Sequence, residues 1–126
     1  DVRRFVALWP GQGLLIADLW QGNAATDRAA SRFLVPDDWH AKAGEPALFL
    51  SQGCSVNVNV PIGTPGVVKP ATWWPRFANP KSAQALCAAA VPINGQGSQG
   101  LVTIFHWGEC PDVDGHLLLS RLKELR

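Results

Sequence analysis

The chain contains no tyrosine and no methionine, and it has only three cysteines among its 126 residues. Three cysteines are too few, and too odd in number, for the disulfide framework of a small secreted domain. Cys54 lies on the apolar side of its segment, so we expect it to be a small buried hydrophobic residue. A bridge between Cys54 and Cys110 stays open as an alternative in an oxidising compartment.

The chain also lacks an excess of charge and long apolar runs. Eleven Lys and Arg stand against ten Asp and Glu, so the net charge is only +1. This balance argues against a nucleic acid or a membrane surface held by electrostatics. No apolar run approaches the roughly 18 residues of a membrane span, and no signal-peptide pattern is present. We therefore expect no membrane insertion, and a partner that is a protein or glycan surface met through shape and apolar contact.

The chain is rich in proline and glycine. Ten prolines and twelve glycines suit many short strands joined by tight turns. With 47% apolar residues, a chain of this length can bury roughly two thirds of its unfolded surface. We expect a single all-β domain over residues 1–126, cut from a longer chain because it starts at Asp1 without an initiator Met, and capable of homo-oligomer formation.

The clearest local pattern covers residues 54–62. Apolar residues alternate there with Ser55, Asn57, Asn59 and Pro61, which is the period of a half-buried strand. Residues 47–51 precede it across Gln52 and Gly53, so a hairpin is predicted in which Gly53 supplies a positive φ.

Four further segments are expected to be extended from similar patterns. Residues 3–9 and 14–20 flank a Pro-Gly turn and predict an opening hairpin. Residues 101–107 are apolar on both parities, which indicates a central strand. Residues 67–74 contain Pro70, which cannot donate to a β-ladder, so this segment is predicted to be an edge strand or irregular.

Helical patterns are fewer and shorter. Asn79 as N-cap and Pro80 at the first position predict a helix over residues 79–90, and residues 24–32 are rich enough in Ala and Arg for two helical turns. Residues 37–46 are expected to be an exposed loop. Residues 116–125 fit either a helix or a strand, and we favour a strand for the first half because an Asp-Gly turn precedes it.

These elements together predict an antiparallel β-sandwich or barrel of about seven short strands with one or two short helices.

Two motifs are weighed for a bound cofactor or metal. Residues 95–100 match the letters of a dinucleotide-binding loop, but such a loop must open a helix, and this one leads into the strand at 101–107. A mobile hairpin loop is the better interpretation. A metal site could draw on five residues whose spacing matches no closed ligand pattern, namely His106, Cys110, Asp112, Asp114 and His116. We expect neither a metal nor another cofactor.

A catalytic alternative rests on one cysteine and one histidine. Cys54 as nucleophile and His106 as base would make a small thiol hydrolase. Thiol proteases of the papain type place the cysteine at a helix N-terminus, whereas Cys54 starts an alternating strand. Our leading interpretation therefore assigns no catalytic residue.

Six tryptophans are a high number for this length. Large aromatic side chains either fill a core or form a flat face for a partner. Trp9, Trp20 and Trp107 lie within strand patterns and are expected in the core. Trp73 and Trp74 are adjacent, so in an extended segment they point to opposite faces and one lies outside beside Arg76. These residues are the predicted binding site, and Trp39 is the second candidate.

The leading functional hypothesis is a non-enzymatic binding or assembly module. We expect a surface-projecting domain of a viral capsid protein, located on the virion surface or outside the cell, that serves host attachment or particle assembly. This expectation rests on analogy at the level of fold class. The alternatives are the thiol hydrolase that uses Cys54 and His106, and a glycan-binding module that uses the exposed tryptophans.

Overall fold

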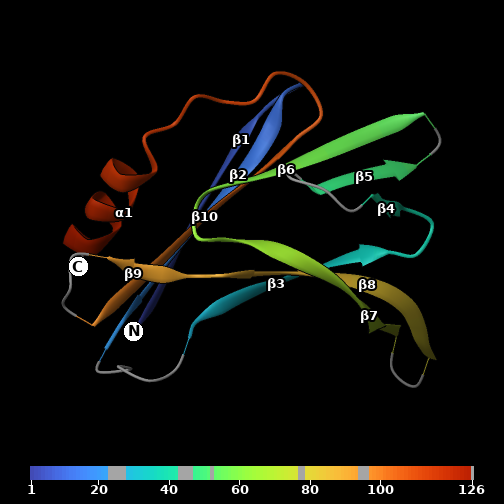
Figure 1. The fold of residues 1–126 in the computed structure, drawn as a ribbon, viewed down its shortest axis with the longest axis horizontal. Helices are drawn as coiled ribbons and strands as arrows, with labels where there is room; N and C mark the ends of the chain where they lie inside the picture. The colour runs from blue at the N-terminus through green and yellow to red at the C-terminus, as the bar shows by residue number, and fades with distance from the viewer. Residues whose placement is uncertain (23–27, 43–46, 52, 77–78, 94–96, 126) are drawn as a thin grey trace.

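Figure 1 shows the fold as a computed structural model, which describes residues 1–22, 28–42, 47–51, 53–76, 79–93 and 97–125. Two antiparallel sheets face each other, and the helix α1 (Gly115–Glu124) packs on the outer side of the larger sheet. The mainly antiparallel β fold that the sequence predicts is confirmed. The described residues contain ten strands rather than about seven, together with this one helix.

The larger sheet contains seven strands. Its order is β1 (Val2–Trp9), β2 (Gly13–Gln21), β10 (Ser98–His106), β6 (Cys54–Ile62), β5 (Ala47–Ser51) and β4 (His40–Lys42), and β9 (Val91–Ile93) also pairs with β10. Both predicted hairpins are present as β1–β2 and β5–β6, and Gly53 has a φ of 79°. β10 lies between β2 and β6, as expected for a strand apolar on both parities.

The smaller sheet contains three strands in the order β3 (Ala30–Pro36), β8 (Asn79–Ala89) and β7 (Thr64–Arg76). β7 is an edge strand, as Pro70 predicts. The helix predicted over residues 79–90 is wrong, because this segment pairs with a strand on each side and forms the centre of the sheet. The helix predicted over residues 24–32 is also wrong where it can be compared, since Ala30–Pro36 is strand β3, while residues 23–27 lie outside the described part.

The last element is a helix where a strand was favoured. Asp114 is its N-cap, and its Oδ1 atom accepts a hydrogen bond from the Leu117 amide at 3.1 Å. The Asp-Gly pair therefore starts a helix and does not turn a hairpin. Leu119 and Leu122 of α1 are buried against the outer face of the larger sheet. The loop predicted over residues 37–46 contains the short strand β4, and residues 43–46 lie outside the described part.

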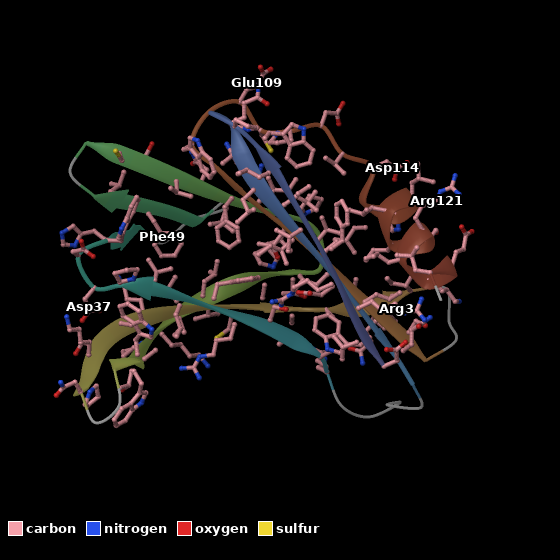
Figure 2. All side chains as sticks on the ribbon, turned by 180° about the vertical axis from the view of Figure 1, so that it is seen from behind. Arg3, Asp37, Phe49, Glu109, Asp114 and Arg121 are labelled. Atoms are coloured by element: carbon pink, nitrogen blue, oxygen red, sulfur yellow. The ribbon has the colours of Figure 1, made fainter. Side chains whose placement is uncertain are left out.

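The core has two parts, one on each side of the larger sheet. Between the sheets, Phe49, Val58 and Leu86 are buried together, and Figure 2 shows Phe49 pointing into this space. Under α1, Leu15, Ala17 and other residues of β2 and β10 are fully buried. The central strands are thus covered on both faces, which explains their continuous apolar sequence.

Of the three tryptophans expected in the core, two are half-buried and one is exposed. Trp9 and Trp20 are half-buried and pack against core clusters. Trp107 is 46% exposed, so its prediction was wrong. It follows the last residue of β10, and its amide donates to the Gln12 carbonyl at 2.9 Å, so it lies just beyond the end of the sheet.

Candidate binding site

An open groove of about 500 Å³ lies at one end of the sandwich. One wall is the turn of residues 37–40 between β3 and β4, and the other is the ribbon of β7 and β8. Figure 2 places Asp37 in this turn, at the end of the smaller sheet. The turn and the ribbon are about thirty to forty residues apart in the chain. The groove therefore exists only because β3 pairs with β8.

Trp39 anchors the turn. Its backbone amide donates to the Pro36 carbonyl at 3.1 Å, and its own carbonyl accepts from the Gln84 side-chain amide of β8. Trp39 packs against the core between the sheets and is also one of the residues that line the groove. Trp39, the second predicted site residue, is thus a half-buried aromatic that is held in place before any partner arrives.

The rest of the lining is mixed in chemistry. Asp37 accepts hydrogen bonds, and Ser82 and Gln84 can both donate and accept them, whereas Lys69 borders the groove from the other side of β7. Val68 and Pro70 contribute apolar surface between these polar groups. One aromatic face and several different polar side chains therefore converge on one open surface.

The predicted pair on β7 lies farther along the same ribbon. Trp73 is 43% exposed and Trp74 is 62% exposed. Pro70 pairs with Gln84, whose side chain reaches the turn, so Pro70, Thr72 and Trp74 follow one another on the turn side of β7. Trp73 follows Lys69 and Ala71 on the other side. The side chain of Arg76, the fourth predicted site residue, lies outside the described part of the structure.

The catalytic pair is not brought together. Asn57 pairs with His106 in the β6–β10 register, so these two side chains share one face of the sheet and Cys54 takes the opposite parity. Cys54 is exposed, so the expectation that it is buried was wrong. It opposes Ser51 at the tip of the β5–β6 hairpin, beyond the residues of β6 that pair with β10. All three cysteines are free, and the alternative Cys54–Cys110 bridge is not formed.

A different cysteine lies near His106. Asn59 Nδ2 is 3.2 Å from Cys110 Sγ and 3.4 Å from His106 Nε2. His106 Nδ1 lies 3.1 Å from the Gly108 carbonyl, which fits a tautomer with the proton on Nδ1 and Nε2 accepting from Asn59. Both groups thus contact the same Asn59 amide, and the thiol and the imidazole are linked through it. The network fastens the loop after β10 to β6.

The other residues weighed as metal ligands are spread out. Asp114 caps α1, while Asp112 and His116 are exposed. Within the described residues, no group of three or more His, Cys, Asp or Glu could hold a metal ion. In the same part of the chain, no helix has the length and apolar character needed to cross a membrane.

Sequence reasoning missed an ion pair whose carboxylate is buried. Asp18 of β2 is 1% exposed and lies on the face between the sheets. Its carboxylate accepts from Arg4 Nε of β1 at 2.6 Å and from Ser31 Oγ of β3 at 2.6 Å. The hydrogen bond to Asp18 raises the pKa of Arg4 above its ordinary value, burial opposes this shift, and the negative charge of Asp18 adds to it. Arg4 therefore stays charged, and its contribution to stability would be lost only as the pH rises through that raised pKa.

Arg3, the neighbour of Arg4, points to the opposite face. Its guanidinium donates to the Leu122 carbonyl at 2.8 Å, the Lys123 carbonyl at 3.1 Å and the Leu125 carbonyl, all at the C-terminal end of α1. Figure 2 shows Arg3 beside the helix. A strand residue thus supplies the cation that a helix C-terminus favours. No periodic pattern in the sequence signals this contact, because 119 residues separate Arg3 from Leu122.

Comparison of the chain with protein-family models, curated proteins and solved structures finds no match.

Proposed function

We propose that this domain is a non-enzymatic recognition module that binds a glycan in the groove between the turn of residues 37–40 and the β7–β8 ribbon. The observation that carries the proposal is the convergence of Trp39 with Asp37, Ser82 and Gln84 on one open surface. A sugar ring presents an apolar face of C–H groups, which an indole can cover, and hydroxyls that both donate and accept hydrogen bonds. The groove offers partners for both.

Trp74 extends this surface along β7. It lies four residues beyond Pro70, or about 13 Å along an extended strand. That span suits an oligosaccharide of several rings better than a single sugar. The near-neutral net charge of the chain also favours a neutral ligand over a strongly acidic one.

The setting we propose for this activity is attachment to a host surface by a domain that projects from a virus particle. Glycan recognition at an exposed end of a sandwich is compatible with that role. The virion itself stays a prediction from fold class.

The test uses neutral linear hexasaccharides of glucose, galactose and mannose, titrated into the domain and followed by calorimetry and tryptophan fluorescence. At least one should bind, and Trp74→Ala should weaken that binding about 10-fold to 30-fold, or roughly 2 kcal/mol. Trp107→Ala removes an equally large exposed ring away from the groove and should leave the affinity unchanged.

Two results would remove the glycan proposal. One is the absence of binding to every hexasaccharide at millimolar concentration. The other is an affinity unchanged in both Trp73→Ala and Trp74→Ala. Capture of a protein by the same groove, with loss of capture in Trp74→Ala, would keep the recognition surface and change the class of its partner.

A further inference from the structure

The larger sheet is wider than the sheet that covers it. Phe105 of β10 meets Phe33 of β3 edge-on, with ring centres 5.1 Å apart, so the Phe105 side of β10 faces the smaller sheet. Directly opposed residues in an antiparallel pair point to the same side. The registers β10–β2 and β2–β1 then place on this inner side, among other apolar residues, Leu14 and Ile16 of β2 and Val2, Val6 and Leu8 of β1. We call these five residues the apolar strip.

The smaller sheet leaves most of the apolar strip uncovered. β3 passes obliquely over the larger sheet, since its Ser31 contacts Asp18 of β2 while its Phe33 contacts Phe105 of β10. It therefore moves away from β1 along its length. Val6 is 55% exposed and Leu8 is 62% exposed. Beside them, a groove of about 300 Å³ between the sheets is lined only by apolar residues, among them Leu14, Ile16, Val35 and Phe105.

A free strand edge borders the apolar strip in each layer. β1 is the last strand of the larger sheet and β3 is the last strand of the smaller one, on the same flank of the sandwich. Unpaired edges present backbone N–H and C=O groups that can join another strand. What covers the apolar strip should therefore supply both an apolar face and a strand.

We propose that the apolar strip is the interface of a symmetric dimer of this chain. The two-fold axis runs along the strands, midway between the two layers. Rotation about this axis places the larger sheet of one copy in the same layer as the smaller sheet of the other copy. The overhanging β1–β2 hairpin of the partner then lies over the apolar strip, with its β1 beside β3. By symmetry the first copy does the same for its partner, so one surface serves both subunits.

The described flank of the sandwich fits this occupant in shape and charge. The larger sheet extends beyond the edge of the smaller sheet, so the extending hairpin of each copy can fill the space beside the smaller sheet of the other copy. Pairing of β3 with β3 of the partner would instead bring both overhanging hairpins into one layer, where they would collide. All five residues of the apolar strip are uncharged, and the nearest guanidinium, that of Arg4, is held by Asp18.

The size of the apolar strip sets the expected strength. Eight residues of β1 span about 26 Å, and two strands are about 10 Å wide, so each copy contributes a few hundred Å². Stable interfaces bury about 1,200–2,000 Å² in total. The dimer should therefore form reversibly and dissociate on dilution through the micromolar range.

The test is sedimentation velocity on the whole chain from about 1 µM to about 1 mM. The wild type should shift from monomer to dimer over this range. Val6→Lys and Leu8→Lys should each weaken association at least tenfold, because a lysine would be buried without a partner in the dimer. Leu117→Lys is the matched control, since Leu117 is 54% exposed on α1, away from the apolar strip, and its variant should associate like the wild type.

Symmetry adds a sharper test. Val6 of one copy lies near the two-fold axis, so a mixture of Val6→Lys and Val6→Glu should form a mixed dimer that neither variant forms alone. Circular dichroism confirms folding of each variant, and Leu8→Lys serves if Val6→Lys fails to fold. A wild type that stays monomeric at 1 mM overturns the proposal, even if the apolar strip accepts a strand from another protein. Association that survives both lysine variants, or that is lost in Leu117→Lys, overturns it as well.

Discussion

Thr103 is a single residue that lowers the stability of the fold. It is fully buried in the middle of β10, beside Ile16, and its hydroxyl has no hydrogen-bond partner among the described residues. A buried hydroxyl without a partner loses the hydrogen bonds it made to water in the unfolded chain, a loss worth about 1–3 kcal/mol. Ser31 is the opposite case, because its buried hydroxyl donates to Asp18 at 2.6 Å.

Thr103→Val should therefore stabilise the domain by about 1 kcal/mol, since valine keeps the branched shape and removes the hydroxyl. The measurement is the midpoint of urea unfolding at unchanged slope. Ser31→Ala is the control and should lower stability by about 1 kcal/mol, because it deprives the buried Asp18 carboxylate of a donor. A Thr103→Val midpoint at or below that of the wild type would contradict this account of Thr103.

For single residues, the sequence predicted the direction of a side chain better than its burial. The adjacent Trp73 and Trp74 were expected to leave an exposed ring, and both rings are exposed. The same alternation placed Cys54 on the apolar side of β6, but it gave no indication that the covering strands end before Cys54. Period-2 patterns report which way a side chain points, whereas its burial depends on partners distant in the sequence.

Among the secondary-structure elements, α1 depends on a residue from the other end of the chain. Arg3 of β1 holds the last carbonyls of the helix, which intrahelical bonds leave without donors. The contact links β1, the first strand of the larger sheet, to α1. The C-terminal turn of α1 should therefore be only as stable as its contact with Arg3.

Arg3→Ala should fray the last turn of α1 and lower the stability of the domain by about 1 kcal/mol. Hydrogen exchange would show faster exchange for the amides of residues 121–124 than for those of 117–119. Arg3→Lys keeps the charge but not the planar fork of donors, so it should give an intermediate effect. Equal exchange rates in all three proteins would mean that the packing of Leu119 and Leu122 alone holds the helix.

The elements also show where sequence patterns stop being decisive. Residues 79–90 carry a helix cap, a proline at the first helical position and alanines, yet β8 runs there because strands flank it on both sides. Helix propensity amounts to tenths of a kcal/mol per residue and yields to such pairing. Residues 116–125 went the other way, because Asp114 caps a helix whose Leu119 and Leu122 cover the larger sheet. The hairpins, by contrast, are local and were predicted.

For the whole molecule, the groove and the apolar strip are two surfaces of one sandwich. The groove opens at the end of the smaller sheet, and the apolar strip lies on the flank beside β3. Neither could be foreseen from sequence, because the groove joins residues 37–40 to the β7–β8 ribbon and the apolar strip depends on how far β3 reaches over β2.

The two surfaces should act independently. Val6→Lys is expected to bind the hexasaccharide with wild-type affinity while it fails to associate, and Trp74→Ala is expected to associate normally while it binds the sugar weakly. Calorimetry and sedimentation on the same two variants test this pattern. Loss of both activities in either variant would indicate that the substitution damages the fold as a whole.

The position of β10 also affects how the chain reaches this structure. β10 is the last strand in sequence, yet it lies between β2 and β6, and its pairing of Ser98 with Gln21 closes a loop of 77 residues. Closing loops of this length before any contact rewards them slows folding, so milliseconds to seconds are expected rather than microseconds. During synthesis, the edges of β2 and β6 that pair with β10 stay unpaired until residue 106 has emerged. The newly made chain is therefore most exposed to misassembly in the interval before β10 emerges and pairs.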